Sequence, residues 1–109
     1  MTKLQQRVAR FARTNWLEAD VAHRLLDAVA ELGELAKEAL KGSNYGAATF
    51  VRTKEWEDEF GDVMFSLLCV ANQTGVDVEK AVARALAKYK KRIAAKGSPG
   101  SRQKGRTRR

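Results

Sequence analysis

Two pairs of acidic residues, each with members three positions apart, are the feature of this chain best suited to chemistry. The pairs are Glu31/Glu34 and Glu59/Asp62, with 24 residues between them. Residues three apart on a helix share a face, so each pair can direct two carboxylates toward one point. Carboxylate oxygens are the ligands that hard divalent cations such as Mg²⁺ and Mn²⁺ accept. The spacing therefore predicts a divalent-metal site between two helices.

Both pairs belong to longer acidic stripes. On a helical wheel, four acids of each segment fall within one narrow sector beside an apolar stripe. They are Asp27, Glu31, Glu34 and Glu38 in the first segment and Glu55, Asp58, Glu59 and Asp62 in the second. Residues 55–79 contain no Lys or Arg, so a bound metal or the cations of another helix should offset the repulsion. A solvated polar face is the alternative interpretation, and it is the commoner one for a single pair. A di-iron site is disfavoured, because it would use Glu-x-x-His twice and His23 is the only histidine.

The elements that must position these acids are helices. Apolar residues recur every three or four positions and strict alternation is absent, which predicts an all-α, four-helix bundle-like fold. We expect helices over residues 4–14, 18–41, 54–74 and 78–95. Thr53 and Asp77 are the expected N-caps of the last two, and Gly42 is the expected left-handed cap after the second. The residues expected to be buried are Val21, Leu25, Val29, Leu32, Ala36 and Ala39 in the second helix, and Trp56, Phe60, Val63, Met64, Leu67 and Val70 in the third.

Length and charge indicate one small domain followed by a basic tail. Of the net charge of +8, five positive charges lie in residues 97–109, which leaves +3 for residues 1–96. The tail has no apolar side chain to anchor it, so we expect residues 1–96 to fold and residues 97–109 to be disordered. A core of this size has little to spare, which favours oligomerisation. Cys69, the only cysteine, excludes an intrachain disulfide. The absence of a signal-like or membrane-spanning apolar stretch predicts a cytoplasmic protein.

The acidic motifs and their surroundings resemble those of the MazG-like nucleoside triphosphate pyrophosphohydrolases, all-α enzymes marked by an E-x-x-E helix followed by E-x-x-D. The matching segments are residues 30–38, 57–71 and 75–82, the last running into residues 88–92. The resemblance covers residues 20–95 and implies a homodimer or homotetramer that cleaves a nucleoside triphosphate to the monophosphate and pyrophosphate with Mg²⁺. The residues concerned would be the metal ligands Glu31, Glu34, Glu59 and Asp62 and the substrate-binding Lys88 and Arg92. Tyr89 stands where many relatives carry Asn, which leaves the preferred base or sugar open.

Metal chemistry of this kind also needs a group that orients or deprotonates the attacking water. Glu38, one turn beyond Glu34, is the candidate for that role. No Ser, Cys or His nucleophile is required.

Two other functions compete with hydrolysis. The chain would be a small helical nucleic-acid-binding protein if the basic tail and last helix formed its working surface. It would be a non-catalytic assembly subunit if the acidic residues bound no metal. The position of the charge favours the hydrolase, because the helices concentrate acid and any contact with nucleic acid would rest on the tail.

Overall fold

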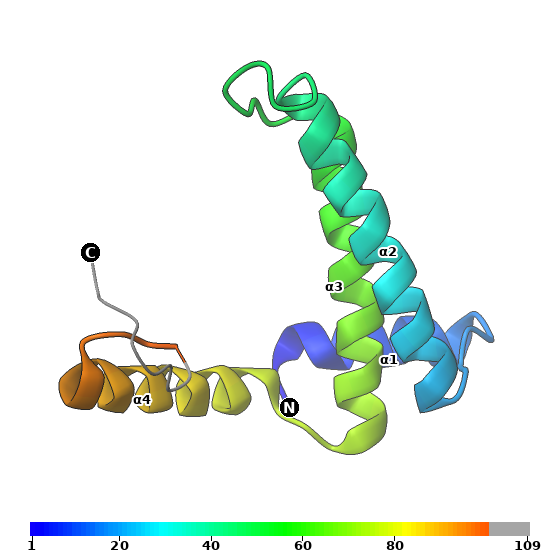
Figure 1. The fold of residues 1–109 in the computed structure, drawn as a ribbon. Coiled ribbons are helices and arrows are strands. Elements are labelled where there is room, and N and C mark those ends of the chain that lie inside the picture. Colours follow the sequence, from blue (N-terminus) through cyan, green and yellow to red (C-terminus); the bar gives the residue numbers. More distant parts are fainter. Residues whose placement is uncertain (101–109) are drawn as a thin grey trace. The chain divides into compact units, whose positions relative to one another are not determined.

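The computed structural model describes residues 1–100, which form four α-helices and contain no strand (Figure 1). The helices are α1 (Lys3–Thr14), α2 (Val21–Gly42), α3 (Lys54–Thr74) and α4 (Val78–Lys96). The predicted all-α fold is confirmed. The disorder predicted for the basic tail concerns mainly residues 101–109, which lie outside the described part of the chain. No helix of residues 1–100 is both long and apolar enough to cross a membrane.

Polar side chains fix where the helices begin. The oxygen of each N-cap accepts a hydrogen bond from the backbone N–H three residues on, as helix N-termini require. Thr53 Oγ1 accepts from Trp56 at 3.1 Å and Asp77 Oδ1 accepts from Lys80 at 3.0 Å, which confirms both predicted caps. Asp20 caps α2 in the same way. The start predicted at residue 18 was therefore three residues too early.

The glycines end the helices in different ways. Gly75 and Gly97 adopt the left-handed conformation after α3 and α4, with φ of 72° and 75°. The cap predicted at Gly42 is wrong: this residue is still helical, and Ser43 follows it with φ of −107°. A Cβ at Gly42 would lie 2.7 Å from a ring carbon of Phe50. The glycine is therefore needed for the loop to approach closely.

The chain divides into two compact units, Met1–Val76 and Asp77–Arg109. In the first unit α2 and α3 lie side by side, and α1 crosses the C-terminal half of α3 (Figure 1). The crossing is held by Gln5, which is fully buried. Its side-chain nitrogen donates to the carbonyl of Val76 at 2.7 Å and to Oδ1 of Asn72 at 3.2 Å. The described residues of the second unit, 77–100, form the helix α4 and the short segment that follows it.

The buried apolar core is small, and it differs from the predicted one. Val63 is buried as expected, but six other residues expected in the core are between 38% and 68% exposed. These six are Leu25, Val29, Leu32, Phe60, Met64 and Leu67. The buried apolar residues are Ala12, Ala28, Leu35, Val63, Leu68, Cys69 and Ala71. The prediction was wrong because two packed helices share one interface, and the apolar stripes extend beyond it.

Candidate metal centre

Packing of α2 against α3 brings the two acidic motifs together. Glu31 of α2 and Glu59 and Asp62 of α3 each offer a carboxylate oxygen, and the three oxygens lie within 4.8 Å of one another. Glu31 and Glu59 are half-buried and Asp62 is exposed. We call these three residues the acidic cluster.

The acidic cluster fits a hard divalent cation. Oxygens bound to one Mg²⁺ at about 2.1 Å can be at most about 4.2 Å apart, so side-chain rotation would close the observed spacing. The donor set, all carboxylate oxygen, also matches what Mg²⁺ and Mn²⁺ accept. The open side at Asp62 leaves room for water and substrate oxygens.

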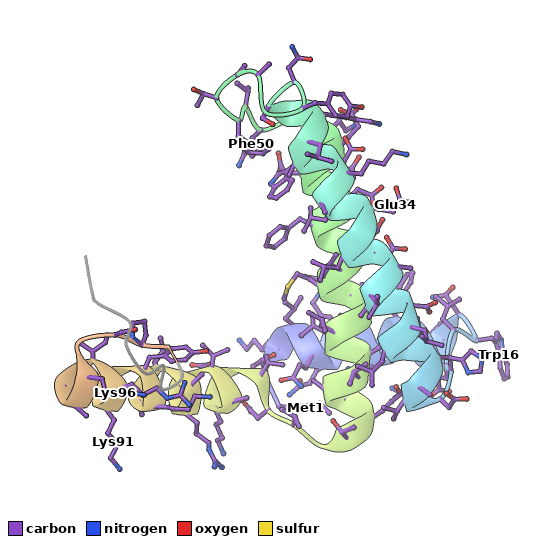
Figure 2. The ribbon with its side chains drawn as sticks, in the orientation of Figure 1. Met1, Trp16, Glu34, Phe50, Lys91 and Lys96 are labelled. Carbon is purple, nitrogen blue, oxygen red and sulfur yellow. The ribbon has the colours of Figure 1, made fainter. Side chains whose placement is uncertain are left out.

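The electrostatics of Glu59 show how closely the carboxylates converge. The pKa of Glu59 is raised above its ordinary value, first by removal of its carboxylate from water. Repulsion from the carboxylates of Asp62, Glu31 and Glu34, in decreasing order of effect, raises this pKa further. A hydrogen bond to the Glu31 side chain also raises it. Glu34 therefore lies close enough for its charge to act on Glu59, although its oxygens are outside the 4.8 Å group. Figure 2 shows Glu34 projecting from α2.

Glu38, the predicted general base, lies one turn beyond Glu34 on the same helix. Its side chain is only 12% exposed, and its Oε2 is 3.4 Å from Nζ of Lys41. The ion pair joins residues three apart on α2, and the Lys41 side chain is 48% exposed. Its role in moving a proton stays a prediction.

Lys88 and Arg92, the predicted substrate-binding residues, both lie on α4 in the second unit. Lys88 Nζ lies 5.3 Å from the centre of the Tyr89 ring, and Arg92 Nη1 donates to the carbonyl of Pro99 at 3.3 Å. The acidic cluster belongs to the first unit, and the contribution of these two cations to its chemistry stays a prediction.

One buried cation was not anticipated from the sequence. Arg24 is 8% exposed, and it donates to the carbonyl of Leu17. Its guanidinium lies 5.5 Å from the centre of the Phe65 ring and 3.8 Å from a carboxylate oxygen of Asp27. Arg24 precedes buried Ala28 by one helical turn, and this spacing is the signal that would have placed it on the inner face of α2.

Comparison with known proteins defines the class. The model of the MazG nucleotide pyrophosphohydrolase domain matches residues 21–95, most of the chain. The chain therefore belongs to the MazG family. It is also similar to the Bacillus subtilis (strain 168) protein named "Uncharacterized protein YpjD", with 40% identity over 65 residues. That alignment covers 57% of this chain and 57% of YpjD, so the chain spans little more than half the length of this curated relative. No solved structure matches.

The family match contains both acidic motifs and α4 up to residue 95. Helix α1 lies outside it.

Proposed function

We propose that this chain is a Mg²⁺-dependent nucleoside triphosphate pyrophosphohydrolase, which converts a ribo- or deoxyribonucleoside triphosphate to the monophosphate and pyrophosphate. The observation that carries the proposal is the convergence of three carboxylate oxygens within 4.8 Å, from two motifs inside the family-matched region. Mn²⁺ is an alternative metal with the same ligand preference. The nucleotide pool on which such an enzyme acts indicates a cytoplasmic location.

Each step of the proposed reaction is assigned to residues of this chain. Glu31, Glu59 and Asp62, with Glu34 beside them, would hold the metal. The metal, when bound, would act as a Lewis acid at the α-phosphoryl group and lower the pKa of a water. Glu38 would orient that water and accept its proton. Lys88 and Arg92 would offset the charge that develops on the pyrophosphate leaving group.

Exposed apolar surface supports the expected oligomer. Leu25, Val29 and Leu32 of α2 are each 46% or more exposed, and Phe60 and Leu67 of α3 are 47% and 44% exposed. Apolar surface of this kind marks an interaction site in a protein that stays in solution. We propose that a second copy covers this α2–α3 face to form a homodimer, or a homotetramer of two such dimers. Light scattering during size-exclusion chromatography measures this directly, and a monomer at micromolar concentration would contradict it.

The activity is tested with a panel of ribo- and deoxyribonucleoside triphosphates in the presence of Mg²⁺. The products distinguish the reaction class: cleavage between the α- and β-phosphates releases pyrophosphate and a nucleoside monophosphate. Release of orthophosphate and a diphosphate would contradict the proposal, as would the absence of turnover with every nucleotide. Glu59→Gln should abolish pyrophosphate release, because it removes charge from the acidic cluster. Glu57→Gln is the matched control, since Glu57 pairs with Arg52 at 3.5 Å and lies outside the cluster.

A further inference from the structure

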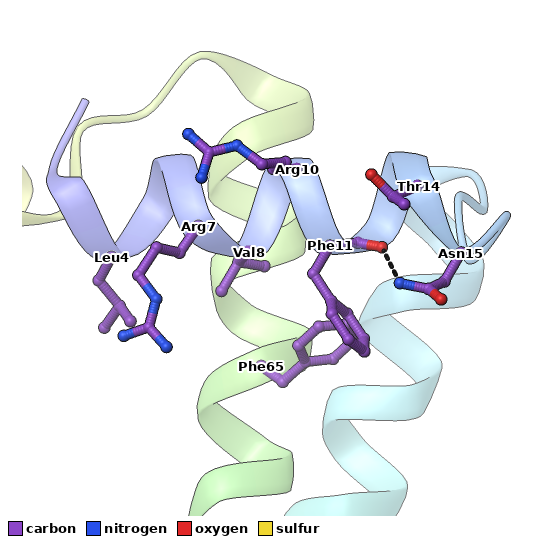
Figure 3. Close-up of a pocket in the computed structure, with 8 residues that line it drawn as sticks. All are labelled: Leu4, Arg7, Val8, Arg10, Phe11, Thr14, Asn15 and Phe65. Carbon is purple, nitrogen blue, oxygen red and sulfur yellow. Dashed lines mark hydrogen bonds between the residues drawn. The ribbon is translucent and has the colours of Figure 1, made fainter.

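An open pocket of about 450 Å³ lies between α1 and α3 in the first unit (Figure 3). Its apolar lining comprises Leu4, Val8 and Phe11 of α1 and Phe65 of α3. The rings of Phe11 and Phe65 meet edge to face, with centroids 6.3 Å apart and an interplanar angle of 89°. Figure 3 shows Leu4, Val8 and Phe11 projecting from the same side of α1.

One helical turn of α3 separates the acidic cluster from the α3 residue that lines this pocket. Phe65 follows Asp62 by three residues, so the two side chains are neighbours on the helix surface, with Cβ atoms about 5–6 Å apart. Helix α2 links the same two places, because Arg24 lies over the Phe65 ring and Glu31 is two turns further along. A ligand bound at the acidic cluster can therefore extend toward Phe65.

The residues that line the pocket favour a ligand that carries negative charge and a planar ring. Arg7 and Arg10 supply guanidinium groups, and Thr14 and Asn15 add hydrogen-bonding groups at the end of α1. No carboxylate is among the eight described residues that line the pocket. Guanidinium groups bind phosphate and stack on planar rings, and aromatic side chains stack on nucleobases. The volume is within the range of small-molecule sites.

We propose that this pocket binds the base and sugar of the nucleotide whose phosphates are held at the acidic cluster, with Phe11 as the principal base contact. The inference rests on the proposed function and adds to it a place for the nucleoside. It also gives α1, which lies outside the family match, a role in substrate selection.

A second aromatic group competes for this role. Phe50, Trp56 and Phe60 form a chain of rings with centroids 5.0 and 6.2 Å apart. Glu55 and Glu57 lie in the same first turn of α3 as Trp56. These carboxylates repel a nucleotide, whereas the pocket on α1 offers cations.

Two matched substitutions separate the alternatives. Phe11 and Phe60 are 54% and 47% exposed, so replacement of either by alanine leaves the small core intact. For Phe11→Ala we expect KM for nucleoside triphosphates to rise between about 5-fold and about 150-fold, the effect of losing one base–aromatic contact. Hydrolysis of inorganic tripolyphosphate, which has no base, should be unchanged. Phe60→Ala should leave KM for both substrates unchanged when it is assayed at a concentration at which size-exclusion chromatography gives the variant the parent's oligomeric state.

Three outcomes of these assays would overturn the inference. They are an equal effect of Phe11→Ala on both substrates, no effect on either, and a nucleotide-specific effect of Phe60→Ala in place of Phe11→Ala. A shift of the oligomeric state by Phe11→Ala without a change in KM would also overturn it, because the pocket would then be a subunit contact.

Binding without metal tests the pocket independently of turnover. We expect titration with a nucleoside monophosphate to give saturable NMR shifts at Phe11, Asn15 and Phe65, and Phe11→Ala to abolish them. The absence of saturable shifts, or shifts confined to residues 50–60, would contradict the inference. Saturable shifts in a protein that hydrolyses no triphosphate would refute the proposed function but support the pocket.

Discussion

Replacing Gln5 by leucine should weaken the whole first unit, because Gln5 is the polar connection between α1 and the end of α3. Its side-chain nitrogen donates to the carbonyl of Val76 and to Asn72, and its side-chain oxygen accepts from the backbone of Thr2 at 3.3 Å. Leucine is similar in size, so the substitution removes these bonds without leaving a large cavity. The partners are Asn72 and Thr2, which are half-buried, and Val76, which is 42% exposed, so water replaces the lost bonds only in part.

The magnitude follows from the number of bonds lost. A net hydrogen bond contributes about 0.5–1.5 kcal/mol, and the substitution removes the three side-chain bonds of Gln5. We therefore expect a loss of about 2–3 kcal/mol in the free energy of unfolding, which for a domain of this size lowers Tm by about 10–20 °C. Thermal unfolding followed by circular dichroism measures this directly.

Gln6→Leu is the matched control. Gln6 is the next residue on α1, but it is exposed, and its side chain bonds only to the carbonyl of Met1 among the described contacts. An exposed substitution of this kind changes stability by less than about 0.5 kcal/mol. Equal Tm values for the two variants would refute the assignment of Gln5 as the connection between α1 and α3.

Three further predictions follow from the same structure. Thr53→Ala removes the N-cap of α3 and should lower the free energy of unfolding, measured by chemical denaturation, by about 1 kcal/mol. Thr74→Ala, at the exposed end of the same helix, is the control and should change it by less than about 0.5 kcal/mol. Equal losses would show that the cap is unimportant. Because the pKa of Glu59 is raised in the folded state, the stability that its protonated form supplies is fully present below the ordinary value of 4.5 and is lost as pH rises through the folded-state pKa. Without metal, Glu59→Gln should therefore be more stable than the parent at neutral pH, and the difference should fade toward pH 4.5. A difference in Tm that stays constant across this pH window would be inconsistent with the raised pKa. Removing residues 101–109 should leave pyrophosphate release unchanged, because every residue assigned to chemistry lies between positions 31 and 92. The same truncation should abolish any salt-sensitive affinity for nucleic acid. Loss of hydrolysis at unchanged Tm would place residues 101–109 in the active site.

Local signals predicted the helices well, because capping depends on residues close in sequence. Helix α3 runs from Lys54 to Thr74 and is capped by Thr53, as predicted. The start of α2 was missed because Glu18 and Asp20 are both acidic, and only the structure shows which oxygen accepts the bond from His23. At Gly42 the deciding contact comes from Phe50, eight residues away, which a local pattern does not contain.

The sequence predicted which face of α2 and of α3 carries the acidic residues, but not which carboxylate oxygens come together. Helical spacing places each acidic pair on one side of its helix. The register of α2 against α3 then decides that Glu31, and not Glu34, contributes an oxygen to the group within 4.8 Å. Buried Gln5 and Arg24 were missed because polar residues are mostly exposed unless tertiary partners satisfy them. The core was overestimated because an apolar stripe does not reveal how much of it the neighbouring helix covers.

The proposed hydrolysis requires a metal bound at the acidic cluster. The decisive measurement is pyrophosphate release from a nucleoside triphosphate over a Mg²⁺ titration, for the parent, Asp62→Asn and the control Glu57→Gln. We expect the parent and the control to show the same saturable dependence on Mg²⁺. Asp62→Asn should lose at least about 100-fold in kcat/KM while keeping its helical content, because it removes a ligand charge from a centre that contributes several kcal/mol. Mg²⁺-independent turnover in the parent, or full activity in Asp62→Asn, would contradict the account.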